Sequence, residues 1–165
     1  MSKTASYWIN KLNLSQHPEG GHYAEIYRSE TTCTTTNGLR NHATAIYFLL
    51  EKGEFSAFHK IASDEIWHFY AGDSLKIFFF DHQKKLQTVL LGNNPENGEV
   101  LTTVIPAGCW FGSTPAANSA YCLAGCTVSP GFDFKDFQLA NAAELMKTYP
   151  DHQELITTYC IDSAN

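Results

Sequence analysis

Apolar and polar residues alternate with a period of two along much of this chain, which predicts a succession of short β-strands. The segment 44–50 is almost continuously apolar, as is typical of a strand covered on both faces. The polar tract 29–41 has no packing pattern and is expected to be a loop that folds over a barrel mouth or reaches a partner. The predicted strands span 23–28, 44–50, 54–59, 65–70, 75–80, 86–91, 100–105 and 120–128. This rhythm predicts an antiparallel barrel or sandwich.

Helical spacing is confined to the two ends of the chain. Residues 4–12 repeat apolar side chains at helical intervals, which predicts a short amphipathic helix. Near the other end, 142–149 and 154–159 predict two short helices that begin at Asn141 and Asp151 as caps. The predicted fold class is therefore all-β with short terminal α-helices.

The composition indicates one globular domain over 1–165. A chain of 165 residues buries about 70% of its extended surface on folding, which is enough for a real core. The net charge is -6 and the basic residues form no run, so neither nucleic acid nor a membrane surface is an expected partner. No apolar run approaches the length of a membrane span and no signal peptide is indicated, so the expected location is cytoplasmic.

The cysteines do not indicate a disulfide framework or a metal site. They are odd in number and widely spread. Cys122 and Cys126 share a strand face but lie too far apart along it to chelate a metal comfortably, and no second Cys or His pair accompanies them. We expect reduced thiols, with Cys122 and Cys126 packed in the core. The five are Cys33, Cys109, Cys122, Cys126 and Cys160.

The strongest indication of a ligand site lies in residues 53–72. His59 ends one predicted strand, and Glu65 begins the next after a polar turn. Strand alternation places Glu65 on one face with Trp67 and Phe69, so it is not an ordinary solvated glutamate. The sequence therefore predicts an imidazole and a carboxylate close together.

The spacing of this stretch resembles the first motif of the cupin superfamily, which has the form G-x5-H-x-H-x3-E-x6-G. Gly53, His59, Glu65 and Gly72 fall on the motif. The position of its second histidine is occupied by Ile61. One of the residues that ligate metal in a typical cupin is therefore missing here.

Further segments resemble the DUF985 (cupin type 5) family of the RmlC-like cupin superfamily over roughly residues 6–140. The second cupin motif, P-x-G-x2-H, is echoed at 106–108, but its histidine position holds Phe111. The resemblance implies a double-stranded β-helix, that is, a jelly-roll barrel, and a homodimer. The segments that carry it are HPEGGHYAEIYRS, TAIYFLL, SDEIWHFYAGD, IPAGCWFG and GCTVSPGFDFKDFQLA.

With that fold, His59 and Glu65 are expected to point into the barrel mouth and attract each other as a charged pair. We expect them to anchor a small polar metabolite in an aromatic-lined pocket. No cofactor is expected, because two of the four usual cupin ligands are absent; a weakly bound divalent metal would use His59 and Glu65. The remaining expected pocket residues are Trp67, Phe111, Arg28 and Tyr47.

Two other functions remain open at this stage. In an epimerase or isomerase, His59 would act as the catalytic base and Glu65 would orient it, as in the sugar-nucleotide enzymes of the cupin superfamily. Alternatively, the chain is a non-catalytic structural or storage-type cupin dimer. The sequence has no nucleophile elbow, Walker loop, dinucleotide fingerprint or H-E-x-x-H motif, so the commonest hydrolase, nucleotide-binding and zinc-protease classes are excluded.

Overall fold

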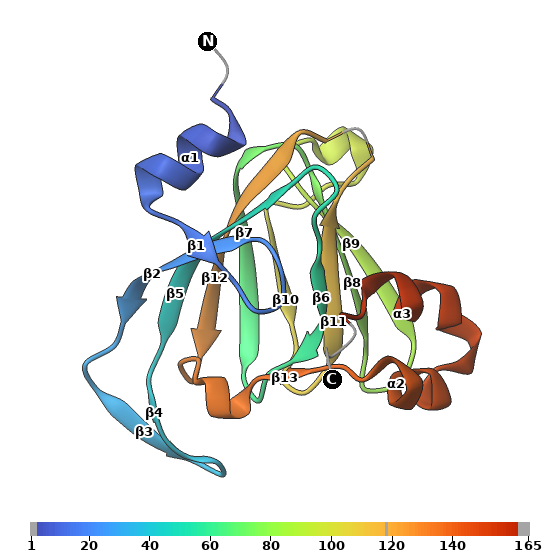
Figure 1. The fold of residues 1–165 in the computed structure, drawn as a ribbon. Coiled ribbons are helices and arrows are strands. Elements are labelled where there is room, and N and C mark those ends of the chain that lie inside the picture. Colours follow the sequence, from blue (N-terminus) through green and yellow to red (C-terminus); the bar gives the residue numbers. More distant parts are fainter. Residues whose placement is uncertain (1–2, 118, 162–165) are drawn as a thin grey trace.

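A computed structural model of the chain describes residues 3–117 and 119–161 and shows a jelly-roll barrel built from two antiparallel sheets (Figure 1). The larger sheet consists, in order, of β1 (Ser15–Gln16), β2 (His22–Arg28), β5 (Thr44–Glu51), β12 (Tyr121–Ser129), β7 (Asp64–Gly72) and β10 (Thr102–Ile105). The smaller sheet consists of β13 (Gln138–Leu139), β6 (Ser56–Lys60), β11 (Trp110–Pro115), β8 (Leu75–Phe80) and β9 (Leu86–Leu91). The all-β fold is as predicted.

Three short helices lie on the outside of the barrel (Figure 1). Helix α1 (Ala5–Leu12) packs on the larger sheet, whereas α2 (Ala142–Thr148) and α3 (Gln153–Tyr159) cover the aromatic outer face of the smaller one. Asn141 caps α2 as predicted, because its side chain accepts a bond from the Glu144 amide at 3.0 Å. Asp151 does not cap α3; it lies inside the 3-10 turn η3 (Pro150–His152), directly after Pro150.

The eight predicted strands are all present, and two further features of the fold were not predicted. Strand β11 was not predicted, because Gly112 interrupts its β pattern; a Cβ there would lie 2.8 Å from Phe78 and 2.9 Å from the Ser56 carbonyl oxygen. The tract expected to be a loop instead forms the hairpin β3 (Thr32–Thr35) and β4 (Gly38–Asn41). None of the helices in residues 3–117 and 119–161 is long and apolar enough to cross a bilayer.

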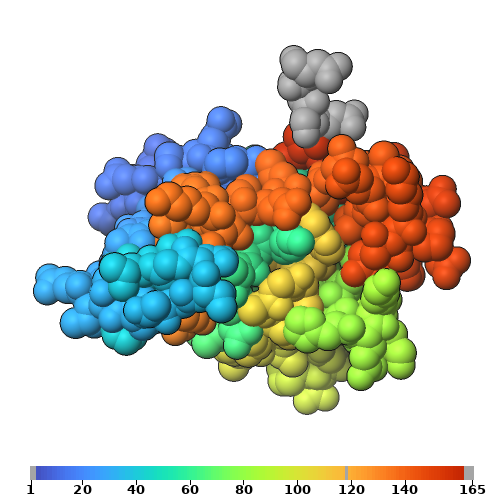
Figure 2. All heavy atoms as spheres, turned by 90° about the horizontal axis from the view of Figure 1, so that it is seen from below, coloured from blue at the N-terminus to red at the C-terminus, as the bar shows by residue number. Residues whose placement is uncertain are grey.

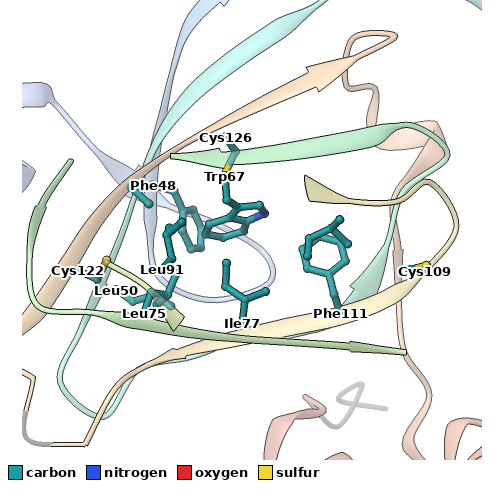
Figure 3. Close-up of a cluster of buried hydrophobic side chains, with 12 residues drawn as sticks. Phe48, Leu50, Trp67, Leu75, Ile77, Leu91, Cys109, Phe111, Cys122 and Cys126 are labelled. Carbon is teal, nitrogen blue, oxygen red and sulfur yellow. The ribbon is translucent and has the colours of Figure 1, made fainter. Parts of the chain in front are cut away.

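In one half of the barrel interior, buried apolar side chains form a cluster (Figure 3). We call this region the packed half. Trp67 and Phe111 both belong to it and are each 1% exposed. Its other fully buried members include Leu50, Leu75, Ile77, Leu91, Ile105 and Cys122.

Candidate functional site

The other half of the barrel interior is hollow and contains a cavity of about 370 Å³. Strands β2, β5, β7 and β12 of the larger sheet, β6 of the smaller sheet and three connecting segments form its wall. This size lies within the range of small-molecule sites. The lining residues are His17, Glu19, Tyr23, Glu25, Arg28, Thr44, Ile46, Phe48, His59, Ile61, Glu65, Cys126, Val128, Phe132, Asp133 and Phe134.

At the inner wall of the cavity, His59 contacts a glutamate that the sequence analysis overlooked. The Nε2 atom of His59 lies 3.1 Å from Oε2 of Glu19, and both residues are buried. The other carboxyl oxygen of Glu19, Oε1, accepts a hydrogen bond from the Ser56 hydroxyl at 2.8 Å. Glu19 is therefore held from two sides by β6.

A β-bulge in β6 turns the side chains of both Ser56 and His59 toward the interior. Phe111 lies opposite His59 and Ser113 lies opposite Ser56, so β6 has one residue more than β11 over the same span. The amide of Ala57, within this bulge, donates to the Glu19 carbonyl at 2.8 Å. The bulge thus fixes the turn that carries Glu19 as well as the two side chains that bind its carboxyl group.

Geometry also sets the tautomer of His59. Its Nδ1 lies 2.7 Å from the Ala57 carbonyl oxygen, which can only accept, so Nδ1 carries a hydrogen. The contact between Nε2 and Glu19 then requires one shared proton, because two lone pairs would otherwise face each other. His59 and Glu19 therefore form a pair that holds one proton.

Burial decides which partner holds that proton. Desolvation lowers the pKa of His59 to about 3, although the bond to Ala57 opposes the shift. Desolvation and the nearby Glu65 raise the pKa of Glu19 well above its ordinary value, and the Ser56 bond opposes this only in part. The proton consequently resides on Glu19, and the pair is neutral at physiological pH.

His17 completes this wall from the same turn as Glu19. Its Nδ1 accepts a hydrogen bond from the Glu19 amide at 3.3 Å, and burial lowers the pKa of His17 to about 4. Its ring packs edge-on against Tyr23 with centroids 4.6 Å apart. The turn requires glycine next to Glu19, because a Cβ on Gly20, at φ 109°, would collide with the Phe55 carbonyl.

Glu65 lies near the start of β7, in the wall of the same cavity, and is 7% exposed. Burial raises its pKa to about 7, and a hydrogen bond with the Cys126 thiol opposes the shift. In residues 3–117 and 119–161, no basic side chain lies within ion-pair distance of Glu65. Glu65 is therefore a buried carboxyl group that faces a cavity without a cationic partner.

The predicted charged pair between His59 and Glu65 is not formed. Both residues line the cavity, but the acid in contact with His59 is Glu19, and burial favours the uncharged forms of His59 and Glu65. The sequence pattern could not show this, because Glu19 enters from a turn with no strand periodicity. The roles of His59 and Glu65 in binding or catalysis remain predictions.

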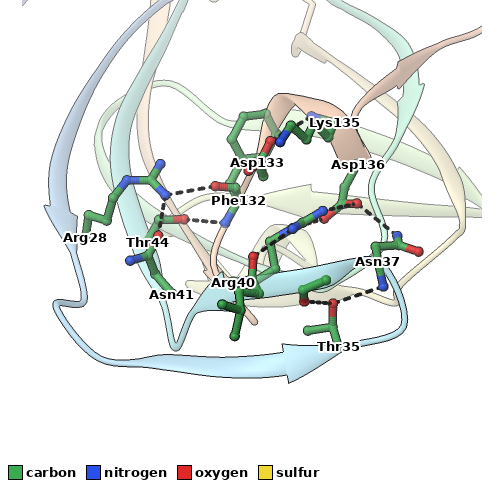
Figure 4. Close-up of polar contacts among 12 residues, drawn as sticks. Arg28, Thr35, Asn37, Arg40, Asn41, Thr44, Phe132, Asp133, Lys135 and Asp136 are labelled. Atoms are coloured by element: carbon green, nitrogen blue, oxygen red, sulfur yellow. Dashed lines mark hydrogen bonds and ion pairs between the residues drawn. The ribbon is translucent and has the colours of Figure 1, made fainter.

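Arg28 stands at the rim of the cavity, where its guanidinium group is already engaged (Figure 4). Its Nε and Nη2 donate to the two carboxyl oxygens of Glu25 at 2.9 and 2.6 Å. Its Nη1 donates to the Asn41 side chain at 2.8 Å and to the Phe132 carbonyl at 3.1 Å. These contacts join β2 to the segment that closes the rim.

A second arginine fastens the β3–β4 hairpin beside this rim. Arg40 donates from Nε and Nη2 to the two carboxyl oxygens of Asp136, at 2.6 and 2.9 Å (Figure 4). Asn37 donates to the same carboxylate at 2.9 Å. Figure 2 shows the hairpin, in cyan, and the segment around η2 (Phe134–Asp136), in orange, side by side at this end of the molecule.

Three residues expected in the pocket do not line it. Trp67 lies in the packed half, and Phe111 contacts His59 from the packed side, with ring centroids 4.0 Å apart. Tyr47 points to the outer face of the larger sheet, where it packs against Tyr70. Alternation along β5 explains this, because its neighbours in sequence, Ile46 and Phe48, face the cavity.

The cavity residues do not fit a tightly bound metal ion. Across the described part of the chain, no group of three or more His, Cys, Asp or Glu residues is arranged to hold one. The cavity wall carries Ile61 where the cupin motif has a histidine. His68 lies on the face of β7 opposite to Glu65, because side chains alternate along the strand, and it bonds to the Thr127 hydroxyl at 3.2 Å.

Comparison with known proteins agrees with the fold and the motifs. The family described as "Cupin superfamily (DUF985)" matches residues 6–140. A hypothetical protein from Leishmania major is 38% identical, with a TM-score of 0.92 over 97% of this chain and 100% of that one. Protein SO0799 from Shewanella oneidensis is 40% identical, with a TM-score of 0.89 over 96% of this chain and 98% of that one.

A relative is also found in Saccharomyces cerevisiae. The uncharacterized protein YML079W is 29% identical over 154 residues, which cover 84% of this chain and 76% of the yeast protein. The family match extends over most of the chain and includes every residue that lines the cavity, from His17 to Phe134. This chain therefore belongs to the DUF985 family of the cupin superfamily.

Proposed function

We propose that this protein binds a small polar metabolite in the hollow half of its barrel. The observation that carries the proposal is a cavity of about 370 Å³ into which the buried groups of Glu19, His59 and Glu65 converge. Small-molecule sites combine apolar walls with a few polar groups in this way. Unpaired buried acids are costly in a purely structural role, and such groups gather at functional sites.

Each part of the wall has a distinct task in this proposal. Ile46, Phe48 and Val128 supply apolar contact for the body of the ligand. Glu65 supplies the polar anchor, since within residues 3–117 and 119–161 its carboxyl group bonds to the Cys126 thiol and to no basic side chain. The Glu19 and His59 pair supplies a second polar contact, and the single proton that the pair shares can move between the two groups when a ligand binds.

The test is to identify small molecules released from protein purified from its own host. Mass spectrometry after denaturation should detect a stoichiometric compound. In the variant Ile46→Trp, a larger side chain fills the cavity, so the compound should be lost while the melting curve stays cooperative. Ile26→Trp is the matched control, because Ile26 lies on the neighbouring strand β2 and is 49% exposed. Equal amounts of compound from all three proteins would contradict the proposal.

A proton-transfer enzyme is the second candidate, favoured by the opposite protonation of two acids in one cavity. Glu19 is protonated, while Glu65 has a pKa of about 7 and is poised to accept a proton. Glu65 thus replaces His59 as the candidate base, because the Nε2 of His59 is occupied by Glu19.

Solvent deuterium separates this candidate from simple binding. If the released compound is a substrate, the protein should exchange one of its carbon-bound hydrogens for deuterium. Glu65→Gln should slow this exchange by about 10² to 10⁴-fold, the usual contribution of a general base. Exchange that proceeds equally in the variant would remove Glu65 from the reaction, and no exchange in the unaltered protein would leave binding alone.

A further inference from the structure

We propose that the head group of the ligand is a cation, a protonated amine, which binds the Glu65 carboxylate inside the cavity. This inference rests on the proposed binding function and adds the chemical class of the ligand. It excludes carboxylates, phosphates and sugar nucleotides as occupants. The argument depends on the charges that line the cavity and on the contacts that each of them already has.

Acidic groups outnumber basic ones in the cavity wall. The carboxyl groups are those of Glu19, Glu25, Glu65 and Asp133, whereas Arg28 is the one Lys or Arg among the lining residues. Four of the five guanidinium N–H groups of Arg28 are used in bonds within the protein. An anionic ligand would therefore meet no free cationic partner in this wall.

The two lining histidines do not change this balance. Burial keeps the pKa of His17 near 4 and that of His59 near 3, so both are neutral at physiological pH. His59 is bonded to Glu19, and His17 accepts from the Glu19 backbone. Neither one offers a positive charge to a ligand.

Glu65 is the group that lacks a charged partner. Two titratable groups lie close to it, because Cys126 on β12 bonds to it, and the charge of Glu65 helps to keep Glu19, on the 17–21 turn, protonated. On its other neighbouring strand, β10, Glu65 lies opposite the apolar Ile105. A cation bound here would compensate the buried carboxylate, which is otherwise costly to ionise.

The aromatic residues of the wall suit the same ligand. Tyr23, Phe48 and Phe134 present rings to the cavity, and rings attract cations through their negative faces. The aromatic pair Phe132 and Phe134, with centroids 4.9 Å apart, lies at the rim. An amine with an apolar body would thus find contacts for both of its parts.

Binding of a cation must be linked to the ionisation of Glu65. A permanently protonated amine binds the ionised carboxylate, so its affinity follows the ionised fraction of Glu65. With a pKa of about 7, that fraction and the affinity rise about tenfold between pH 6 and pH 8. At pH 7 each bound amine displaces about half a proton, because Glu65 is then about half protonated.

Three probes of nearly equal size test the head group. Benzylamine, benzyl alcohol and benzoate share one ring and differ in charge, and calorimetry measures their binding at pH 6 and pH 8. Benzylamine should bind most tightly, with affinity that rises about tenfold over this range. Benzyl alcohol should bind more weakly and without pH dependence, and benzoate most weakly of all. Titrations at pH 7 in two buffers of different ionisation enthalpy should report the released proton.

The variant Glu65→Gln should abolish the pH dependence of benzylamine binding and remove the preference for benzylamine over benzyl alcohol at pH 8. Glu96→Gln is the matched control, because Glu96 is exposed, does not line the cavity and changes the net charge equally. This control should behave as the unaltered protein does.

Other outcomes separate this inference from the binding function. If benzoate or benzyl alcohol binds more tightly than benzylamine at pH 8, the cavity is a small-molecule site but the ligand is not a cation. Release of a neutral or acidic compound from protein purified from its own host would likewise show that the cavity binds a ligand that is not a cation. If none of the probes binds at millimolar concentration, the inference is overturned, and the binding function is judged by the released compound alone.

Discussion

The packed and hollow halves of this barrel share strands β5, β7 and β12, yet the cavity lies in the hollow half. On β7, Glu65 faces the cavity, whereas Trp67, two residues further along the same face, is enclosed in the packed half. On β5, Ile46 lines the cavity and Leu50 is in the packed half. The two ends of a single strand therefore have different roles.

The loops at the open end explain the difference. In the packed half, buried apolar side chains from the two sheets pack against one another. In the hollow half, the 17–21 turn inserts Glu19, and the 132–134 segment forms a rim instead of filling the interior. Polar groups can then be buried against one another, and the space between them remains open.

The largest expected effect is a difference in stability between an Ile→Ala substitution in the packed half and one in the hollow half. Ile77→Ala in the packed half should lower the free energy of unfolding by about 4 kcal/mol, because it leaves a new void. Ile46→Ala in the cavity wall should cost only about 1 to 2 kcal/mol, because its side chain already borders open space. Urea unfolding of both variants measures the difference. Equal losses would mean that the cavity is not a real void in solution.

The pH dependence of stability tests the ionisation of Glu65. Its carboxyl group has an ordinary pKa of 4.5 when unfolded and about 7 when folded, so the folded state holds the extra proton between these values. Stability from this group is present below about pH 4.5 and is lost as the pH rises through about 7. Glu65→Gln avoids that loss.

The stability of Glu65→Gln relative to the unaltered protein should therefore rise by about 3 kcal/mol when the pH is raised from 4 to 8. Urea unfolding of both proteins at pH 4 and at pH 8 measures this change. The variant Glu96→Gln should show no such gain, since Glu96 is exposed. A flat difference for Glu65→Gln would show that Glu65 ionises normally in the folded protein.

A smaller effect separates two buried serines on neighbouring strands. Ser56 donates its hydroxyl hydrogen to Glu19, whereas the Ser113 hydroxyl has no hydrogen-bond partner among the described residues. Ser56→Ala should cost about 1 kcal/mol, and Ser113→Ala should be neutral or slightly stabilising. Both serines are 0% exposed and face each other in register, so each controls for the other. A larger loss in Ser113→Ala would contradict the assigned bond to Glu19.

Periodicity and turn residues in the sequence were enough to predict most of the fold. The strands 75–80 and 86–91 were placed at their observed bounds, because regular alternation depends only on neighbouring residues. The family resemblance was confirmed over residues 6–140. Strand β11 and the β3–β4 hairpin were not predicted, because their formation depends on distant partners such as Phe78 and Asp136.

Prediction of the site was limited by a different cause. The alternation of side chains shows which face of a strand a residue is on, but not whether it lies at the hollow or the packed end of the barrel. For this reason Trp67 was expected in the pocket together with Glu65. Glu19 was overlooked because it lies in a turn, where no period marks it. A signal was nevertheless present, since an acid between His17 and the pair Gly20 and Gly21 suggests a turn pressed closely against the protein. The homodimer and the cytoplasmic location remain predictions.

The most direct test of the account is a crystal structure of the protein soaked with benzylamine at pH 8. The account predicts the amine nitrogen within hydrogen-bond distance of the Glu65 carboxylate and the aromatic ring against Phe48. A cavity closed by side chains, or a ligand whose nitrogen points out past Arg28 toward solvent, would contradict it.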